Sequence, residues 1–172
     1  MIETTIFQIG RCSISGIPVH TLELDDKVIY LSFSEESLFR AKNQLHSDNS
    51  HCLFKNTRNL TLCKKISAAL HGDKTFAFPA DSPFIKKATL FQKKVWELIS
   101  TIPHGETLSY GELAEKLGGK SYARAVGNAC NTNPVALIIP CHRVVGRNGI
   151  GGFAGGISIK QKLLELEKNK SG

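Results

Sequence analysis

The chain has 172 residues, 41% of them hydrophobic, and a formal net charge of +7. This length can bury the core of one domain or of two small ones, and the composition is ordinary for a globular protein. No apolar run is long enough to span a membrane, and no basic-then-apolar leader opens the chain. We therefore expect no membrane partner and a cytoplasmic location, or a nuclear one in a eukaryote.

The net positive charge comes entirely from the second half of the chain. Residues 1–83 hold nine Lys/Arg and nine Asp/Glu, whereas residues 84–172 hold thirteen Lys/Arg and six Asp/Glu. A basic half suits a polyanionic partner. Charge alone fits a solvated basic surface equally well.

The cysteine pattern argues against a disulfide framework. Five cysteines are scattered along the chain, and no Cys-x-x-Cys occurs. A zinc site built from Cys12, Cys52, Cys63 and nearby histidines is conceivable, but these spacings match no compact zinc motif. We predict neither a bound metal nor a cofactor.

The first half of the chain predicts a small α+β unit. The expected strands are residues 4–9, 17–24 and 28–33. Their close spacing indicates an antiparallel meander. Ser34 is a good N-cap for a helix that reaches about Leu45. The polar residues 46–59 predict a loop, and apolar spacing in residues 62–70 predicts a second helix that ends near Gly72. No motif in this half indicates a catalytic or binding site, so we expect it to support the second half structurally.

A proline-marked segment, residues 76–83, predicts a boundary between two domains. The predicted domains are residues 1–83 and 84–172. Thr89 can cap the next helix, which ends by Pro103 and carries Phe91 and Trp96 at helical spacing. We assign these two aromatic side chains to the core rather than to a site.

Two short helices joined by glycines follow. Ser109 begins a capping box, and its helix is expected to end near Leu117. Gly118-Gly119 makes the turn, and Ser121 is expected to cap a second helix over residues 122–131. This is the outline of a helix-turn-helix in a mostly helical second half. Many two-helix hairpins bind nothing, but in a basic half the outline favours DNA binding.

The second of these helices lacks the long polar side chains that read base edges in a major groove. Its exposed candidates are Ala123, Arg124, Ala125, Gly127 and Asn128. Small side chains permit close approach to a groove floor, which favours a minor-groove helix with little sequence specificity. For Arg124, an ion pair within the protein is the alternative.

One cysteine has neighbours in the sequence that favour a catalytic role. Cys141 lies in Pro140-Cys141-His142-Arg143-Val144, between the apolar run 135–139 and the glycine-rich segment 146–156. We expect a buried, strand-like run that delivers the thiol to a loop whose backbone can approach a ligand closely. A thiol attacks as thiolate and needs a base, and His142 serves only if a turn replaces the strand at this point. A buried structural cysteine is the alternative.

This pentapeptide resembles the active-site signature of the O6-alkylguanine-DNA alkyltransferases. Further motifs occur in that family's order and at similar spacing: Phe91-Gln92-Lys93-Lys94-Val95-Trp96, Ser109-Tyr110-Gly111-Glu112-Leu113-Ala114, Ala123-Arg124-Ala125-Val126-Gly127 and Asn133-Pro134. They cover the chain from about residue 85 to the C-terminus. The first eighty or so residues resemble the family only in length and arrangement.

The resemblance implies direct-reversal DNA repair. The alkyl group of O6-alkylguanine would pass irreversibly to Cys141. His142 would act on this thiol through a water, and Glu167 would orient His142. Asn133 would tie the active-site turn together, and Tyr110 would donate to N3 of the base.

On the DNA side, the resemblance implies a helix in the minor groove of a duplex, with the damaged base flipped out and Arg124 inserted in its place. The expected DNA contacts are Ser121, Tyr122, Ala123, Arg124 and Asn128. The expected substrate pocket is made by Pro140, Val144, Phe153 and Ala154. The carbonyls of Cys141 and Val144 would accept from the exocyclic amine, and the loop around Ala154 would donate to O6.

Two points stay open within the resemblance. Phe153 stands where a tyrosine is common in the family, and the loop before Gly155 is one residue shorter than in many members, so the range of alkyl groups is undetermined. O4-alkylthymine is a further candidate substrate. On residues alone, Glu165 suits His142 as well as Glu167 does, because both lie on the last expected helix.

The implied product is a thioether that nothing in the sequence would cleave, so we expect each molecule to act once. We also expect the protein to be a monomer. Three rivals remain. A sensor that binds damaged DNA without repairing it is opposed by the presence of Cys141. A cysteine hydrolase is opposed because such enzymes take their His from elsewhere in the sequence. A transcriptional regulator is opposed by the sparse polar surface of the second helix.

Overall fold

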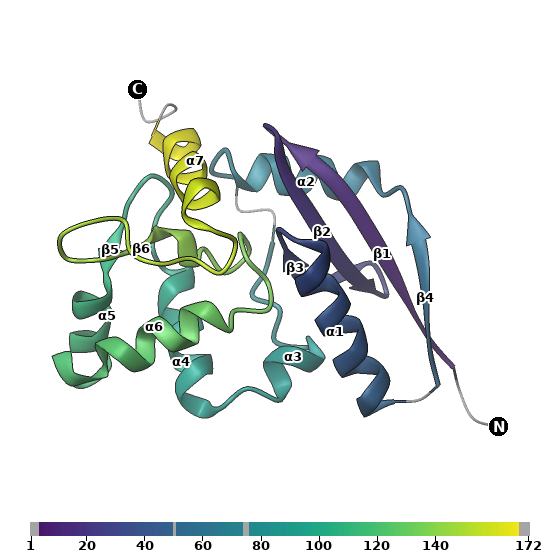
Figure 1. Ribbon diagram of the computed structural model, residues 1–172, viewed down its shortest axis with the longest axis horizontal. Coiled ribbons are helices and arrows are strands. Elements are labelled where there is room, and N and C mark those ends of the chain that lie inside the picture. The colour runs from purple at the N-terminus through teal and green to yellow at the C-terminus, as the bar shows by residue number, and fades with distance from the viewer. Residues whose placement is uncertain (1–3, 50, 74–75, 169–172) are drawn as a thin grey trace.

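The computed structural model describes residues 4–49, 51–73 and 76–168. Its first half is a four-stranded sheet with a helix on each face (Figure 1). The strands are β1 (Thr5–Ile14), β2 (Ile17–Leu24), β3 (Lys27–Ser32) and β4 (Cys52–Thr57), in the spatial order β3-β2-β1-β4. The α+β class expected from the sequence is confirmed.

The first three strands form the predicted antiparallel meander. The turn between β2 and β3 uses Asp25 and Asp26 at φ 50° and 59°. Two successive positive φ values characterise the tight hairpin turn whose twist matches that of the strands. Aspartate tolerates this region because its short side chain can hydrogen-bond locally.

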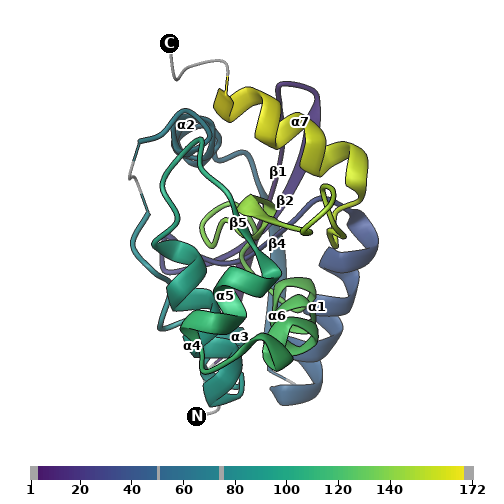
Figure 2. The ribbon, with the colours of Figure 1, turned by 90° about the vertical axis from the view of Figure 1, so that its left-hand side faces the viewer.

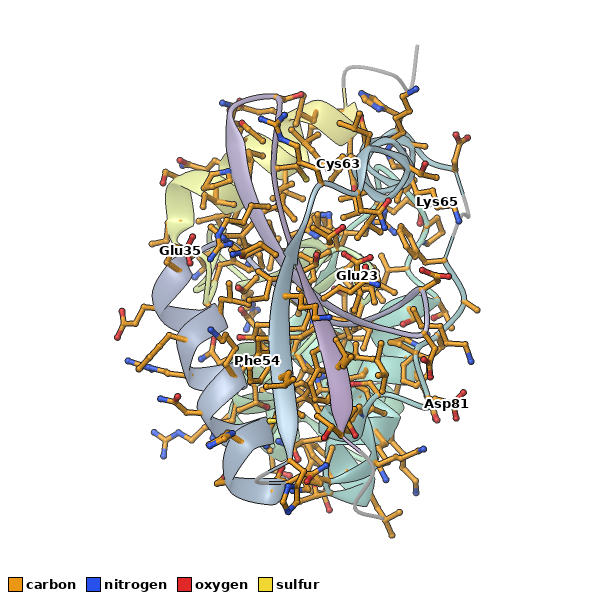
Figure 3. The ribbon with its side chains drawn as sticks, turned by 90° about the vertical axis from the view of Figure 1, so that its right-hand side faces the viewer. Glu23, Glu35, Phe54, Cys63, Lys65 and Asp81 are labelled. Atoms are coloured by element: carbon orange, nitrogen blue, oxygen red, sulfur yellow. The ribbon has the colours of Figure 1, made fainter. Side chains whose placement is uncertain are left out.

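Residues 52–57, expected within a loop, instead form β4, which pairs with β1 in parallel. β4 is an edge strand in which only Cys52 is buried, so its sequence lacks the regular apolar–polar alternation that predicts a strand. Its Phe54 stacks on Phe7 of β1 with 5.5 Å between ring centroids, close to α1 (Figure 3). The sheet is therefore mixed, and the all-antiparallel prediction is wrong at this edge.

Two helices cover the faces of the sheet. α1 (Glu35–Asp48) begins at the predicted cap, Ser34, whose hydroxyl accepts from the Ser37 amide. α2 (Leu60–Ala69) begins at Asn59, whose side chain accepts from the Leu62 amide. The side chains buried by the two helices are Leu38, Ala41 and Leu45 from α1, and Leu62 and Ile66 from α2.

The second half is mostly helical. Its elements are α3 (Pro83–Lys86), α4 (Leu90–Ser100), β5 (Leu108–Ser109), α5 (Tyr110–Lys116), η1 (Lys120–Tyr122), α6 (Ala123–Asn131), η2 (Cys141–Arg143), β6 (Val144–Val145) and α7 (Ile157–Lys168), where η marks a 3-10 turn. Capping boxes at Thr89 and Ser109 begin α4 and α5 as predicted. Trp96 is buried as expected, and its Nε1 donates to the Ala129 carbonyl at 2.8 Å, which joins α4 to α6. No helix of the described residues is long and apolar enough to cross a membrane.

The predicted pair of helices around the glycine turn is present as α5 and α6 (Figure 2). Ser121, however, does not cap the second helix. Residues 120–122 form η1, and α6 begins at Ala123 with Tyr122 at the cap position and no side-chain cap bond. Gly118 and Gly119, at φ 119° and 149°, turn the chain directly into η1, so the helical path begins before the expected cap.

The apolar run 135–139 is largely buried, as predicted, but is not a regular strand. It touches β3 through a single bridge, in which the Leu31 amide donates to the Pro134 carbonyl at 2.8 Å. The Ile139 amide then donates to the Val135 carbonyl at 3.0 Å, and Leu137 has φ 72°, so the chain turns. One hydrophobic core contains side chains from both halves, and the domain boundary at residue 83 stays a prediction.

Candidate active site

The thiol of Cys141 is held at the start of η2, directly after the apolar turn. Its side chain is buried, and Asn133 Nδ2 lies 3.0 Å from Sγ. The same amide nitrogen donates to the Ile139 carbonyl at 2.8 Å, and Asn133 Oδ1 accepts from the Val135 amide at 3.0 Å. Asn133 therefore connects both ends of the apolar turn to the thiol.

Burial raises the pKa of Cys141 to about 11. The hydrogen bond from Asn133 and the positive charge of Lys160 oppose this rise, because both stabilise the thiolate. The protonated thiol is thus the resting form at neutral pH. A base must remove its proton before it can attack.

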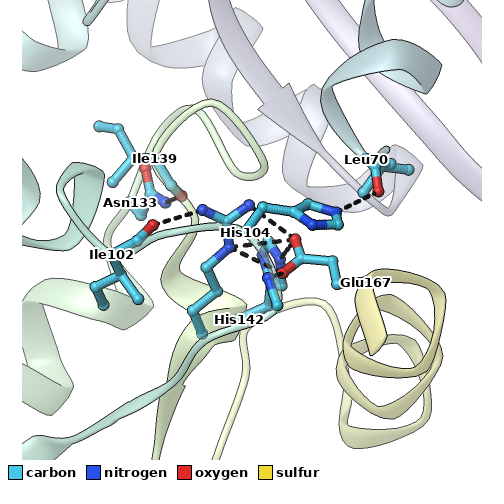
Figure 4. A network of polar contacts seen from close by, with 9 residues as sticks. Leu70, Ile102, His104, Asn133, Ile139, His142 and Glu167 are labelled. Atoms are coloured by element: carbon cyan, nitrogen blue, oxygen red, sulfur yellow. Dashed lines mark hydrogen bonds and ion pairs between the residues drawn. The ribbon is translucent and has the colours of Figure 1, made fainter. Parts of the chain in front are cut away.

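His142 is the second residue of η2, and its side chain contacts α7. His142 Nε2 lies 2.7 Å from Glu167 Oε1, and both side chains are 1% exposed (Figure 4). Arg143 completes the group, with Nε and Nη2 donating to the Glu167 carboxylate at 2.9 to 3.2 Å. The turn that the sequence analysis required at this point is present as η2 (Cys141–Arg143).

The charges in this group are set by burial and by hydrogen bonds. Burial alone would raise the pKa of Glu167, but the hydrogen bonds from His142 and Arg143 and their charges lower it to about 2. Burial lowers the pKa of His142, against the opposing effect of Glu167. His142 Nδ1 is buried and has no hydrogen-bond partner among the described residues. A neutral imidazole anchored at Nε2 therefore leaves Nδ1 as its proton acceptor.

A backbone turn after α4 supports the same group. The Ile102 carbonyl accepts from Arg143 Nη1 at 2.7 Å, and the Gly105 amide donates to Glu167 Oε2 at 3.1 Å. Gly105 has φ 78°, a value that few other residues adopt. Glu167 is thus held from three sides, by His142, Arg143 and Gly105.

Tyr110 and Lys160 form a second polar group beside the thiol network. The Tyr110 hydroxyl donates to the Gly152 carbonyl at 3.1 Å, and burial raises its pKa to about 12. Lys160 is fully buried, and its Nζ donates to the Val144 carbonyl at 2.6 Å and to the Gly152 carbonyl at 3.0 Å. Burial lowers the pKa of Lys160, while Cys141 raises it.

The glycine-rich loop is packed too closely for larger residues at two positions. A Cβ on Gly151, which has φ 71°, would lie 2.8 Å from the Tyr110 ring. A Cβ on Gly155 would lie 2.5 Å from the ring of Phe33. Phe153 packs on Phe33 with 5.6 Å between ring centroids. The loop is therefore seated on aromatic side chains from both halves of the chain.

The expected DNA contacts lie on the surface of η1 and α6. Ser121, Tyr122, Arg124 and Asn128 are exposed, and Ala123 is half-buried. Tyr122 packs on Phe91 with 5.7 Å between ring centroids. Gly127 brings α6 near Tyr110, since a Cβ there would lie 3.9 Å from that ring. Tyr110 thus lies between α6 and the glycine-rich loop.

The structure brings the five expected catalytic residues into two adjoining groups. Cys141, Asn133, His142 and Glu167 surround η2, and Tyr110 lies beside them with Lys160. Glu165 is exposed, so the geometry selects Glu167 as the partner of His142. Of the expected pocket residues, Pro140 and Val144 are buried, Phe153 is half-buried and Ala154 is exposed.

Sequence reasoning missed Lys160, Arg143 and Gly105 as members of the site. For Lys160 a signal existed. Lys160, Leu163 and Glu167 have i, i+3, i+7 spacing, which places two charged residues on the apolar face of the last helix. No comparable signal marked Gly105, whose role comes from its backbone amide. No cluster of three or more His, Cys, Asp or Glu suited to a metal ion occurs in the described parts of the chain.

Comparisons with known proteins identify the family of this chain. Residues 90–169 match the family described as 6-O-methylguanine DNA methyltransferase, DNA binding domain. The curated methylated-DNA–protein-cysteine methyltransferase of Mycobacterium tuberculosis is 52% identical over 86 residues, which are 49% of this chain and 52% of that protein. Its counterpart in Methanosarcina acetivorans is 50% identical over 88 residues, 51% of this chain and 56% of that protein. The chain spans about half the length of these curated relatives in the alignments.

Solved structures match nearly the whole chain. A crystal structure of Mycobacterium tuberculosis OGT in complex with DNA has 32% sequence identity and a TM-score of 0.70, and the match covers 95% of this chain and 94% of that one. A crystal structure of O6-methylguanine-DNA methyltransferase from Pyrococcus kodakaraensis has 25% identity and a TM-score of 0.71, over 94% and 98% of the two chains. The likeness thus includes the N-terminal sheet, and the chain belongs to the O6-alkylguanine-DNA alkyltransferase family.

Proposed function

We propose that this protein repairs DNA by transferring the alkyl group of O6-alkylguanine in duplex DNA to Cys141, once per molecule. The observation that carries this proposal is the arrangement around η2. The buried thiol of Cys141 is held 3.0 Å from Asn133 Nδ2, next to a buried His142–Glu167 pair. Residues 84–172 would carry the DNA surface and the thiol, and residues 1–83 would support them.

The first step is the activation of the thiol. Its proton passes through a bridging water to His142 Nδ1, and Glu167 stabilises the imidazolium through Nε2. Burial keeps His142 neutral beforehand, which is the form that accepts a proton. The low pKa of Glu167 keeps its carboxylate charged throughout. Lys160 and Asn133 stabilise the thiolate that remains.

The second step is a displacement at the alkyl carbon. The S–C bond forms, the C–O6 bond breaks, and the bonding electron pair moves onto the guanine. Tyr110, protonated because of its raised pKa, turns from the Gly152 carbonyl to donate to N3 of this anion. The thioether has no route back to a thiol here, so transfer stops at one equivalent and needs no cofactor.

The base itself would be held by backbone groups of the site. The carbonyls of Cys141 and Val144 already accept from the Val144 amide and from Lys160, and each retains a second lone pair for the exocyclic amine. The Ala154 region is exposed and would donate to O6. Pro140 and Phe153 would border the ring.

DNA would bind through η1 and α6 in the minor groove. Arg124 is exposed and makes no ion pair within the described residues, so its side chain is available to enter the stack in place of a flipped base. Ser121, Tyr122, Ala123 and Asn128 would line the contact. A DNA substrate places the protein in the cytoplasm, or in the nucleus of a eukaryote.

The test is the intact mass of the protein after mixing with a duplex that carries one O6-methylguanine. We expect a gain of one methyl group, mapped by peptide analysis to Cys141 and limited to one equivalent. Cys141→Ser should gain nothing, whereas the matched control Cys130→Ser should still gain one methyl. A second duplex with O4-methylthymine tests that substrate.

The rivals predict other outcomes. Tight binding to the damaged duplex without a mass gain would overturn transfer and favour a damage sensor. If the protein showed no mass gain and no preference for damaged DNA, only the helix pair would remain as a DNA-binding feature. That outcome would favour a regulator that prefers one operator sequence.

A further inference from the structure

The side chain of His104 joins the turn between α4 and β5 to the N-terminal half of the chain. His104 Nε2 lies 3.0 Å from the carbonyl oxygen of Leu70, at the C-terminal end of α2. Gly72, at φ 94°, lies against the same imidazole, since a Cβ there would be 3.4 Å from His104 Cγ. Figure 4 shows His104 between Leu70 and the Glu167 group.

Two residues close to His104 in this turn, Ile102 and Gly105, form hydrogen bonds with the active-site side chains. The Ile102 carbonyl accepts from Arg143, and the Gly105 amide donates to Glu167. Within the turn, the Glu106 amide donates to the Pro103 carbonyl at 3.2 Å. The bond from His104 to Leu70 therefore fixes the turn against α2 at its centre.

We propose that His104 is a positioning residue through which α2 of the N-terminal half orients Glu167. Its Nε2–H donates to the Leu70 carbonyl, which fixes the Ile102–Gly105 turn, and the Gly105 amide then fixes the carboxylate that anchors His142. This inference rests on the proposed alkyl transfer and assigns a specific task to the supporting half. A misplacement of about 1 Å in a reacting group can cost up to ~100-fold in rate.

Two substitutions separate the hydrogen bond from the packing. His104→Phe keeps a ring against Gly72 but removes the donor. His104→Gln carries an amide nitrogen that can occupy the position of Nε2 and should restore the bond. Both variants are compared with the unsubstituted protein in single-turnover methyl transfer, in binding to the damaged duplex, and in thermal unfolding.

We expect His104→Phe to slow methyl transfer by about ten-fold, with the active fraction and the dissociation constant for DNA unchanged. His104→Gln should transfer at close to the original rate. Without DNA, the pH midpoint for alkylation of Cys141 by iodoacetamide should move upward in His104→Phe, because a poorly anchored His142 is a weaker base. A role in stability alone would lower the active fraction and leave this midpoint unmoved.

The inference is overturned if His104→Phe keeps both the rate and the midpoint, or if His104→Gln is as impaired as His104→Phe. Failure of the proposed function gives a different result, because the unsubstituted protein would then gain no methyl group. The iodoacetamide midpoint would still report on the coupling between His104 and the thiol in that case.

Discussion

Lys160 Nζ lies 2.6 Å from the carbonyl oxygen of Val144, and the whole Lys160 side chain is buried. A buried ammonium is costly unless its hydrogen bonds are satisfied and an opposite charge lies near. Two carbonyls, of Val144 and Gly152, satisfy part of this need, and the thiolate of Cys141 would be the nearby negative charge. Lys160 thus links the geometry of the glycine-rich loop to the ionisation of the thiol.

Replacing Lys160 by Met should raise the pKa of Cys141 still further, because the positive charge that lowers it is removed. Each unit of increase lowers the thiolate fraction at neutral pH about ten-fold. The measurement is the rate of Cys141 alkylation by iodoacetamide as a function of pH. Lys162→Met, on the exposed side of α7, is the matched control and should keep the original profile. Equal profiles for the two variants would contradict the role of Lys160.

Glu167→Gln should lower the free energy of unfolding in a pH-dependent way. The folded protein lowers the pKa of Glu167 to about 2, below its ordinary value. A depressed pKa adds stability that is fully present above the unfolded pKa of about 4.3 and is lost as the pH falls through the folded value. The variant should therefore be less stable by on the order of 3 kcal/mol at pH 7, and the difference should shrink between about pH 4 and pH 2.

Urea unfolding of both proteins across that range measures this difference. Glu165→Gln is the matched control, since Glu165 is exposed on the same helix and should change stability little at any pH. A constant difference between the Glu167→Gln variant and the original protein from pH 7 to pH 2.5 would mean that the carboxylate charge is not what stabilises the fold.

Gly155→Ala should be destabilising, because the new Cβ would lie 2.5 Å from Phe33 and 2.9 Å from Phe153. Overpacking of this kind costs about 1–3 kcal/mol. Gly152→Ala, three residues earlier in the same loop, meets no atom within 4 Å and should be tolerated. Thermal unfolding of the two variants checks the contrast, and similar midpoints would show that the loop yields at Gly155.

Features that depend on particular side chains could be predicted from the sequence more fully than features that depend on backbone hydrogen bonds. Cys141, Asn133 and Tyr110 could be predicted as site residues because the family's motifs fix residue type and spacing together. β4 was missed because an edge strand is held by backbone hydrogen bonds to β1 and needs few apolar side chains. The residues alone could not decide whether Glu165 or Glu167 of α7 is the partner of His142. The structure decides it, because Glu167 is buried and Glu165 is exposed.

Arg124→Ala should impair transfer only where a base must leave a stacked duplex. Arg124 is exposed on α6 and has no ion-pair partner among the described residues, so its loss should not disturb the fold. Extruding a base costs a few kcal/mol, and a side chain that fills the gap offsets part of this cost. We expect transfer from duplex O6-methylguanine to slow by ten-fold or more, roughly 1.4 kcal/mol in the barrier.

Transfer from a single-stranded oligonucleotide with the same base should be nearly unchanged, because no partner base has to be left behind. Lys55→Ala, which removes an exposed positive charge from β4, is the control for net charge and should leave both rates as they were. Single-turnover rates on the two substrates provide the comparison. Equal slowing on duplex and single strand would mean that Arg124 contributes to general DNA binding and has no specific part in base extrusion.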